Sequence, residues 1–261
     1  MEYLAERIGG DKVSVRNLVP AGAEPHDWEP SPKDIAAIQK AKVFVYQGIV
    51  ETWADRIVSD MNTGKTAVVK AIDGQDLMES EDTEIPGKDP HVWLDPSRYS
   101  REAEAIYASL EKADAANSST YKANLDALRE DLDALDIDFK AGLTNCERKT
   151  IFTAHSAFGY LAQRYGLKQV AVSGISPDAE PSPARLRKVI EQIKAEKATY
   201  IFFETLVSPK IEKTLADEAG IKTLVLNPLE GLTEKEIQAG DDYIIVMRSN
   251  LANLRLALGC Q

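Results

Sequence analysis

Along the chain, short apolar runs typical of strands alternate with stretches in which apolar residues recur every three or four positions, as in helices. Because short apolar runs alternate with helical spacing, we expect parallel sheets with helices packed on their faces. In the first half, strands are expected at residues 12–19, 43–46 and 66–72, and helices at residues 2–8, 32–41, 51–61 and 96–110. In the second half, strands are expected at residues 149–153, 169–173, 200–203 and 222–226, and helices at residues 158–165, 182–193, 208–219 and 233–258.

Between the two halves lies the longest periodic stretch of the sequence. Its apolar residues recur every three or four positions, which places them on one face of a single helix. They are Tyr121, Leu125, Leu128, Leu132, Leu135 and Phe139. Such a helix spans roughly 30 Å at ~1.5 Å per residue. No Gly/Ser-rich linker flanks it, so the helix itself can serve as a stiff linker.

The predicted fold is therefore α/β, with two Rossmann-like lobes that contain parallel sheets and are joined by one long rigid linker helix. We expect an N-terminal lobe over residues 1–117, the linker helix over residues 118–142, and a C-terminal lobe over residues 143–261.

The chain has three histidines, and none of them lies in an amphipathic helical run. His26 and His91 lie in Pro-bounded loops, and His155 follows a predicted strand. Histidine is the commonest metal ligand, because its neutral imidazole offers a nitrogen lone pair near neutral pH. His155, Glu204 and Glu230 all follow strands, at the edge where open α/β sheets bind ligands. The pattern predicts one metal site between the lobes.

Three histidines and one carboxylate form a closed four-coordinate shell, which suits Zn(II). A site with nitrogen ligands also has a higher intrinsic affinity for zinc than for manganese. A closed shell holds an ion rather than using it, and the sequence contains no HExxH, GxSxG, GxxxxGK[ST] or GxGxxG motif. We therefore expect no enzyme. The alternative from another class is a zinc-dependent hydrolase with Glu230 or Glu204 as general base.

Four further residues near the histidines have two interpretations each. Asp27 and Asp95 could accept hydrogen bonds from imidazole N–H groups and so orient the ligands. Helix capping or simple surface exposure explains them equally well. Trp28 and Trp93 are typical of core aromatics, and could also shield the site from water.

Charge and composition exclude several classes of function. The net charge of -11 lacks the basic footprint that nucleic-acid binding requires. No apolar run approaches the ~20 residues of a membrane span. The first seven residues have neither a basic start nor an apolar core, so we expect that an exported protein would be a processed form.

Cys146 and Cys260 are the two cysteines, and their separation excludes a CxxC redox pair. They are either two buried thiols or one disulfide that ties the end of the chain to its middle. The disulfide is slightly favoured, and would contribute ~3–5 kcal/mol in the chain-entropy model.

Four motifs together resemble the zinc/manganese solute-binding proteins of bacterial ABC transporters, the cluster A-I metal receptors, in their zinc-type branch. The motifs, in order, are Pro25-His26-Asp27-Trp28, Asp89-Pro90-His91-Val92-Trp93, Thr153-Ala154-His155-Ser156 and Asn227-Pro228-Leu229-Glu230. The resemblance covers nearly the whole chain. It implies a monomer that captures the ion between its lobes and delivers it to an ABC transporter membrane permease. It also implies an extracytoplasmic location, in the periplasm or at the outer face of the membrane, with a lipid-anchored precursor.

By the same resemblance, His26, His91 and His155 match the three histidine ligands. Many members have an aspartate near the position of Asn227, and the branch that reads Asn-Pro-Leu-Glu uses the glutamate, so Glu230 is the expected fourth ligand. Glu204 is the second candidate, because manganese-type members take a glutamate where this chain has His155. A Mn(II) or dual-metal receptor, or a cell-adhesion protein of the same fold, is the alternative function.

The sequence departs from the family pattern in two places. The family usually begins with a strand before the first helix, whereas this chain starts at that helix, so the first lobe is expected to lack an element. Residues 74–88 form an acidic loop without the histidines of many zinc-type members, and we expect a solvated surface loop there.

Overall fold

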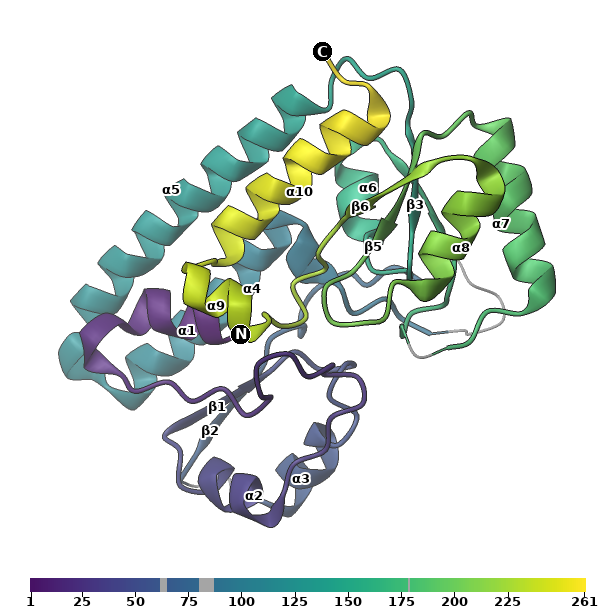
Figure 1. Cartoon of the computed structure of the whole chain (residues 1–261). Coiled ribbons are helices and arrows are strands. Elements are labelled where there is room, and N and C mark those ends of the chain that lie inside the picture. Colours follow the sequence, from purple (N-terminus) through teal and green to yellow (C-terminus); the bar gives the residue numbers. More distant parts are fainter. Residues whose placement is uncertain (62–64, 80–86, 178) are drawn as a thin grey trace.

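The chain forms two α/β lobes connected by one long helix (Figure 1), as seen in a computed structural model that describes residues 1–61, 65–79, 87–177 and 179–261. The N-terminal half contains α1 (Glu2–Gly9), η1 (Gly10–Lys12), α2 (Pro32–Ile38), β1 (Val43–Tyr46), α3 (Ala54–Asp60), β2 (Ala67–Lys70), η2 (Val92–Leu94), α4 (Pro96–Ala113) and η3 (Ala115–Asn117). The remainder contains α5 (Ser118–Gly142), β3 (Thr150–Thr153), α6 (Gly159–Tyr165), β4 (Lys168–Ala171), α7 (Pro183–Ala195), β5 (Tyr200–Phe203), α8 (Lys210–Ala219), β6 (Lys222–Val225), α9 (Glu234–Ala239) and α10 (Tyr243–Leu258).

The strands pair in parallel, as the alternation of strands and helices predicts. β1 pairs with β2 in the first lobe. In the second lobe β3 pairs with β4 and β5 pairs with β6, while β3 also lies next to β5. The carboxyl ends of β3, β5 and β6 therefore lie along one edge of the lobe, and His155, Glu204 and Glu230 follow these three strands.

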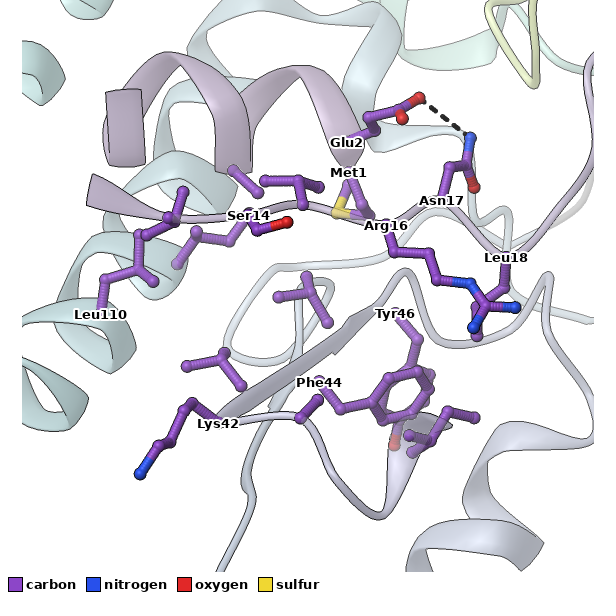
Figure 2. A pocket seen from close by; sticks show the side chains of 18 of the residues that line it. Met1, Glu2, Ser14, Arg16, Asn17, Leu18, Lys42, Phe44, Tyr46 and Leu110 are labelled. Carbon is purple, nitrogen blue, oxygen red and sulfur yellow. Dashed lines mark hydrogen bonds between the residues drawn. The ribbon is translucent and has the colours of Figure 1, made fainter. Parts of the chain in front are cut away.

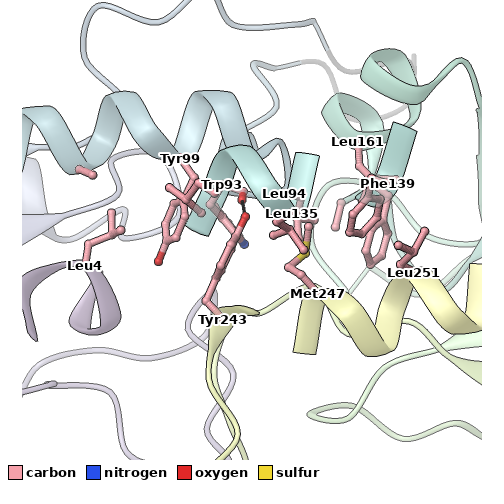
Figure 3. Packing of buried hydrophobic residues seen from close by; sticks show 14 of the residues in the cluster. Leu4, Trp93, Leu94, Tyr99, Leu135, Phe139, Leu161, Tyr243, Met247 and Leu251 are labelled. Carbon is pink, nitrogen blue, oxygen red and sulfur yellow. Dashed lines mark hydrogen bonds between the residues drawn. The ribbon is translucent and has the colours of Figure 1, made fainter. Parts of the chain in front are cut away.

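The long helix α5 is more than a connector between the lobes. It packs against α1, α4 and α10, and its apolar face, including Leu135 and Phe139, is fully buried. Figure 3 shows these side chains meeting Tyr243 and Met247 of α10 in one continuous apolar cluster. Because the cluster draws on elements before and after α5, the two lobes share a core. The proposed lobe boundaries around α5 stay a prediction.

Two expected elements differ in the structure. Residues 13–17 form no regular strand (Figure 2), because no described residue pairs with them in a ladder, although burial alternates over residues 13–16 as in a strand. The single helix expected over residues 233–258 is two helices. Gly240 ends α9 with a φ of 79°, and the side chain of Asp242 accepts the N–H of Ile245 to begin α10.

Cys146 and Cys260 form a disulfide, the alternative that the sequence slightly favoured. Part of the acidic loop over residues 74–88, including its acids Glu81, Asp82 and Glu84, lies outside the described residues. Within the described ranges, no helix has both the length and the apolar character that a bilayer span requires.

Asp136 on the inner face of α5 ties this helix to α6. Its carboxylate accepts hydrogen bonds from Arg164 at 2.7 and 2.8 Å and from the hydroxyl of Tyr165 at 3.0 Å. Burial alone would raise the pKa of Asp136, but the hydrogen bonds from Arg164, Lys140 and Tyr165 outweigh it and lower the pKa to about 2. The charged carboxylate is therefore favoured in the folded state.

We predict that Asp136→Asn lowers the free energy of unfolding by about 2 kcal/mol at pH 7. Because the pKa of Asp136 is lower in the folded state than in the unfolded state, its ionisation stabilises the folded state at pH values above the unfolded pKa. This contribution is lost as the pH falls from about 4 to about 2. Urea unfolding at pH 7 and pH 3 should therefore show a smaller difference between D136N and wild type at pH 3. The matched control is Asp138→Asn. Asp138 lies on the same helix as Asp136 and forms an exposed ion pair with Arg248 of α10. Equal losses at both pH values would contradict the prediction.

Candidate metal centre

The structure brings His26, His91, His155 and Glu230 together, with one potential ligand atom of each within 4.8 Å of the others. His26 lies in the loop before α2, and His91 lies directly before η2. His155 follows β3, and Glu230 follows β6. Residues separated by up to 204 positions thus meet at one point, at the carboxyl ends of the parallel strands.

The four side chains have the spacing of a tetrahedral shell. The Nε2 atoms of His26 and His91 both lie 3.1 Å from Oε1 of Glu230, and Nε2 of His155 lies 3.2 Å from it. The Nε2 atoms of His91 and His155 are 3.4 Å apart. Ligands of tetrahedral zinc are about 3.3 Å apart, since Zn–N bonds are ~2.0–2.1 Å long. These four distances are therefore close to those that such an ion requires, and all four ligand atoms lie within 4.8 Å of one another.

Glu230 also has an oxygen that the protein leaves without a partner. Its Oε2 atom is buried and accepts no hydrogen bond among the described residues. A buried carboxylate oxygen without a partner is costly, and each such case calls for an explanation. A cation held by Oε1 at the centre of the four ligand atoms would balance the charge of this carboxylate.

Two carboxylates fix the orientation of the buried histidines from outside. Asp89 lies 2.7 Å from Nδ1 of His91, and Glu204 lies 2.7 Å from Nδ1 of His155. Since an ionised carboxylate only accepts, both Nδ1–H groups donate, and both Nε2 lone pairs are left facing the centre. Glu204, the second candidate for the fourth ligand, therefore lies behind His155 and not at the centre. The sequence did not single out Asp89, although it stands two residues before His91.

The charges of the centre shift the pKa values of its members. Burial alone would lower the pKa of His155, but the charges of Glu230 and Glu204 hold it well above its usual value. Burial would likewise lower the pKa of His91, and hydrogen bonds to Asp89 and Glu230 raise it instead. Burial opposes ionisation of Glu230, but the charge of His155 and the three histidine contacts keep its pKa well below the usual range. The centre is therefore built to hold positive charge.

Glu24 is a further acid at this centre that the sequence analysis did not find. Its Oε1 atom accepts the backbone N–H of His26 at 3.2 Å, and its Oε2 atom is buried without a partner among the described residues. Burial and the charge of Glu230 raise the pKa of Glu24 to about 8. Its position two residues before His26 is the only sequence signal that could have found it.

Of the two interpretations of Asp27 and Asp95, the structure shows helix capping and surface exposure and not the orienting of imidazoles. Asp95 accepts the N–H of Ser97 at 2.9 Å and so caps α4, and Asp27 is exposed. Of the two tryptophans, Trp93 lies against the site, with its ring centroid 5.1 Å from that of His91. Trp28 packs on Trp53 in the core of the first lobe.

The backbone around Asn227 aims Glu230 at the centre. Asn227 accepts the N–H of Leu229 at 2.8 Å, and Leu229 takes a positive φ of 57°, which is rare for a side chain of this kind. The amide of Asn227 donates to Thr205 and to Glu236. Asn227 is thus a positioning residue of the loop.

Comparison with known proteins places this centre in a family. Residues 1–257 match the ZnuA family, described as zinc-uptake complex component A, periplasmic. The zinc-binding lipoprotein AdcA of Streptococcus pneumoniae is 43% identical over 96% of the chain, which spans about half (52%) of the length of that relative.

Solved structures agree with this assignment. The Zn(II)-bound ZnuA-like domain of S. pneumoniae AdcA superposes with a TM-score of 0.86 at 42% identity, over 98% of this chain and 95% of that one. The laminin-binding protein Lmb of Streptococcus agalactiae, described as bifunctional with adhesin and metal-transporting activity, has a TM-score of 0.89 at 33% identity, over 99% and 96% of the chains. The predicted two-lobe α/β fold is confirmed, and the chain belongs to the ZnuA family.

Proposed function

We propose that this chain is a solute-binding receptor that captures Zn(II) between its two lobes, with His26, His91, His155 and Glu230 as ligands. The observation that carries the proposal is the convergence of three Nε2 atoms on one carboxylate oxygen at 3.1–3.2 Å. Three imidazoles and a carboxylate fill a tetrahedral shell with no open position, which suits an ion that is carried. Nitrogen-rich ligation favours zinc over Mn(II).

The receptor would act outside the cytoplasm and pass its ion to the membrane permease of an ABC importer. Membership in a family of periplasmic zinc-uptake components supports both points. A lipid-anchored precursor is supported by the lipoprotein AdcA. We further propose that the receptor works as a monomer, with residues 1–117 and 143–261 as its lobes.

The hydrolase alternative receives no support from the geometry. A general base must face a metal-bound water. Oε1 of Glu230 instead lies 3.1–3.2 Å from the Nε2 atoms of the three histidines, and Glu204 is engaged with Nδ1 of His155. Members of the ZnuA family are receptors, in agreement with the expectation that the chain is not an enzyme.

Adhesion is a second candidate function, favoured by the similarity to Lmb. An adhesive surface would act independently of the centre if the metal is only cargo. Binding to immobilised laminin that persists in His155→Ala would favour adhesion in addition to capture, and no binding by wild type would remove this candidate.

Competitive zinc titration of chelator-stripped protein tests the ligand set. We predict one tight equivalent of zinc and much weaker binding of manganese. Glu230→Gln or His155→Ala should weaken zinc binding by more than about 100-fold, whereas Glu204→Gln, which only loosens an orienting contact, should cost about 10- to 100-fold. Glu234→Gln, at an exposed position of α9, is the control and should change nothing. A larger loss in E204Q than in E230Q would reverse the ligand assignment.

We also predict that zinc binding releases protons above the usual histidine pKa. His91 and His155 have raised pKa values, so they hold their protons to a higher pH than a free imidazole does, and zinc must displace these protons. Zinc affinity should therefore begin to fall above pH 6.5 as the pH is lowered. Calorimetry at pH 7.5 in buffers of different ionisation enthalpy should show net proton release, and less of it in E230Q. A flat affinity between pH 8 and pH 6 would count against the three-histidine centre.

A further inference from the structure

Asp89, the carboxylate that orients His91, is held in place from several sides. Its Oδ1 atom accepts the backbone N–H of His91 at 2.9 Å and lies 2.7 Å from Nδ1 of the same residue. Its own backbone N–H donates to the carbonyl of Met78 at 2.9 Å. Only 5% of Asp89 is exposed, so a movement of its carboxylate would have to be accommodated within a close-packed interior.

The first residue of α6, Gly159, lies against this carboxylate. A Cβ atom at Gly159 would stand 2.8 Å from Oδ2 of Asp89, closer than real Cβ atoms approach other heavy atoms. Asp89 cannot turn Oδ2 away without also moving Oδ1, since both oxygens belong to one planar group. Gly159 does not take a positive φ, so space and not backbone conformation requires glycine here. The missing side chain therefore makes the room in which the carboxylate faces His91.

The second residue of α6, Tyr160, holds the backbone of Asp89. Its hydroxyl donates to the carbonyl of Asp89 at 2.9 Å and accepts the N–H of Met78 at 2.8 Å. Burial raises the pKa of Tyr160 to about 12, so the hydroxyl keeps its proton and can donate. The guanidinium of Arg98 lies over the ring, 4.6 Å from its centroid. Tyr160 thus fixes the point at which the segments of Met78 and Asp89 meet.

These contacts join distant parts of the chain. Asp89 and His91 lie before α5, whereas α6 lies after it. His155 stands only four residues before Gly159, so one short segment supplies a ligand of the centre and shapes the carboxylate behind another ligand. The other orienting pair is different, because Glu204 and His155 both follow α5. The orientation of His91 thus depends on a contact between the parts of the chain before and after α5.

We propose that Gly159 and Tyr160 are positioning residues of the metal centre, which hold Asp89 and through it turn Nε2 of His91 toward the ion. This inference rests on the proposed receptor function and adds that the segment after α5 prepares a ligand from before α5. Neither residue is a ligand, so each acts through Asp89. A disturbed contact between Asp89 and α6 loosens the imidazole of His91 and weakens zinc binding, although all four ligands remain.

A double-mutant cycle of Gly159→Ala with Asp89→Ala tests the contact. Gly159→Ala should weaken zinc binding about 10- to 100-fold, the usual loss when an outer partner of a metal ligand is disturbed. In the Asp89→Ala background the same substitution should change the affinity by no more than about twofold, because the side chain with which it collides is gone. The matched control is Gly87→Ala, since the nearest described atom to a Cβ there is Cδ1 of Ile175, at 3.9 Å. An equal loss in both backgrounds, or no loss in either, would overturn the proposal.

Two tyrosines of α6 keep the test decisive if Gly159→Ala does not fold. Tyr160→Phe removes the hydrogen bond to Asp89 and should weaken zinc binding about 2- to 10-fold. Tyr165→Phe removes a hydroxyl of the same helix that donates to Asp136 at 3.0 Å, and it should leave the affinity unchanged. Equal zinc affinities of the two variants would contradict the assigned role of Tyr160.

A measurement without zinc separates this inference from the receptor function. The chain has three histidines, so 15N-histidine labelling gives few ring N–H signals, and the one that Asp89→Ala removes is assigned to His91. In the metal-free protein, Gly159→Ala and Tyr160→Phe should shift or remove this signal, whereas Tyr165→Phe should not. An unchanged signal in the first two variants would overturn the proposal. A wild type with this pattern of signals but no zinc binding would refute the receptor function and still support the positioning of His91.

Discussion

The structure depends on the contact between one carboxylate oxygen and three imidazoles that come from distant parts of the chain. Oε1 of Glu230 lies within 3.2 Å of the Nε2 atoms of His26, His91 and His155. Such a cluster is costly to bury unless each member is oriented and its charge is balanced. Asp89 and Glu204 orient two of the imidazoles, and Asn227 aims Glu230. The protein thus builds the shell of a cation from residues that the fold alone brings together.

The shared core limits how the two sides of this shell can move. α5 is buried against α1, α4 and α10, and Tyr243 of α10 donates its hydroxyl proton to the carbonyl of Trp93 at 2.7 Å. Trp93 in turn donates its indole N–H to the carbonyl of Pro228 at 2.7 Å, next to the loop of Glu230. The segment after His91 and the segment before Glu230 are therefore coupled through one buried side chain. Close-packed interiors of this kind transmit strain and resist hinge rotation. His26 is the most exposed of the three histidines, with 11% of its side chain exposed.

The sequence predicted those features that depend on residue type and period. The three histidines and the long helix follow from chemistry and spacing, whereas the choice of Glu230 as the carboxylate follows from the resemblance to the family. The structure contains all of them. The sequence did not separate the ligand Glu230 from the orienting residue Glu204, because both residues follow strands. The left-handed backbone at Leu229 helps to set the direction of Glu230, and no periodicity reveals it. Residues 12–19 show the opposite failure. Apolar and polar residues alternate there as in a strand, but a strand also needs a second strand to pair with. A local sequence pattern does not show whether that second strand is present.

The most direct test of the central claim is X-ray absorption at the zinc edge on the zinc-loaded protein. Multiple scattering from imidazole rings counts the histidine ligands, and the first shell gives the number and length of the bonds. We expect three imidazoles and one carboxylate oxygen in a four-coordinate shell, with bonds of about 2.0–2.2 Å. A shell with two imidazoles, or with a water in place of the carboxylate, would contradict the closed receptor site.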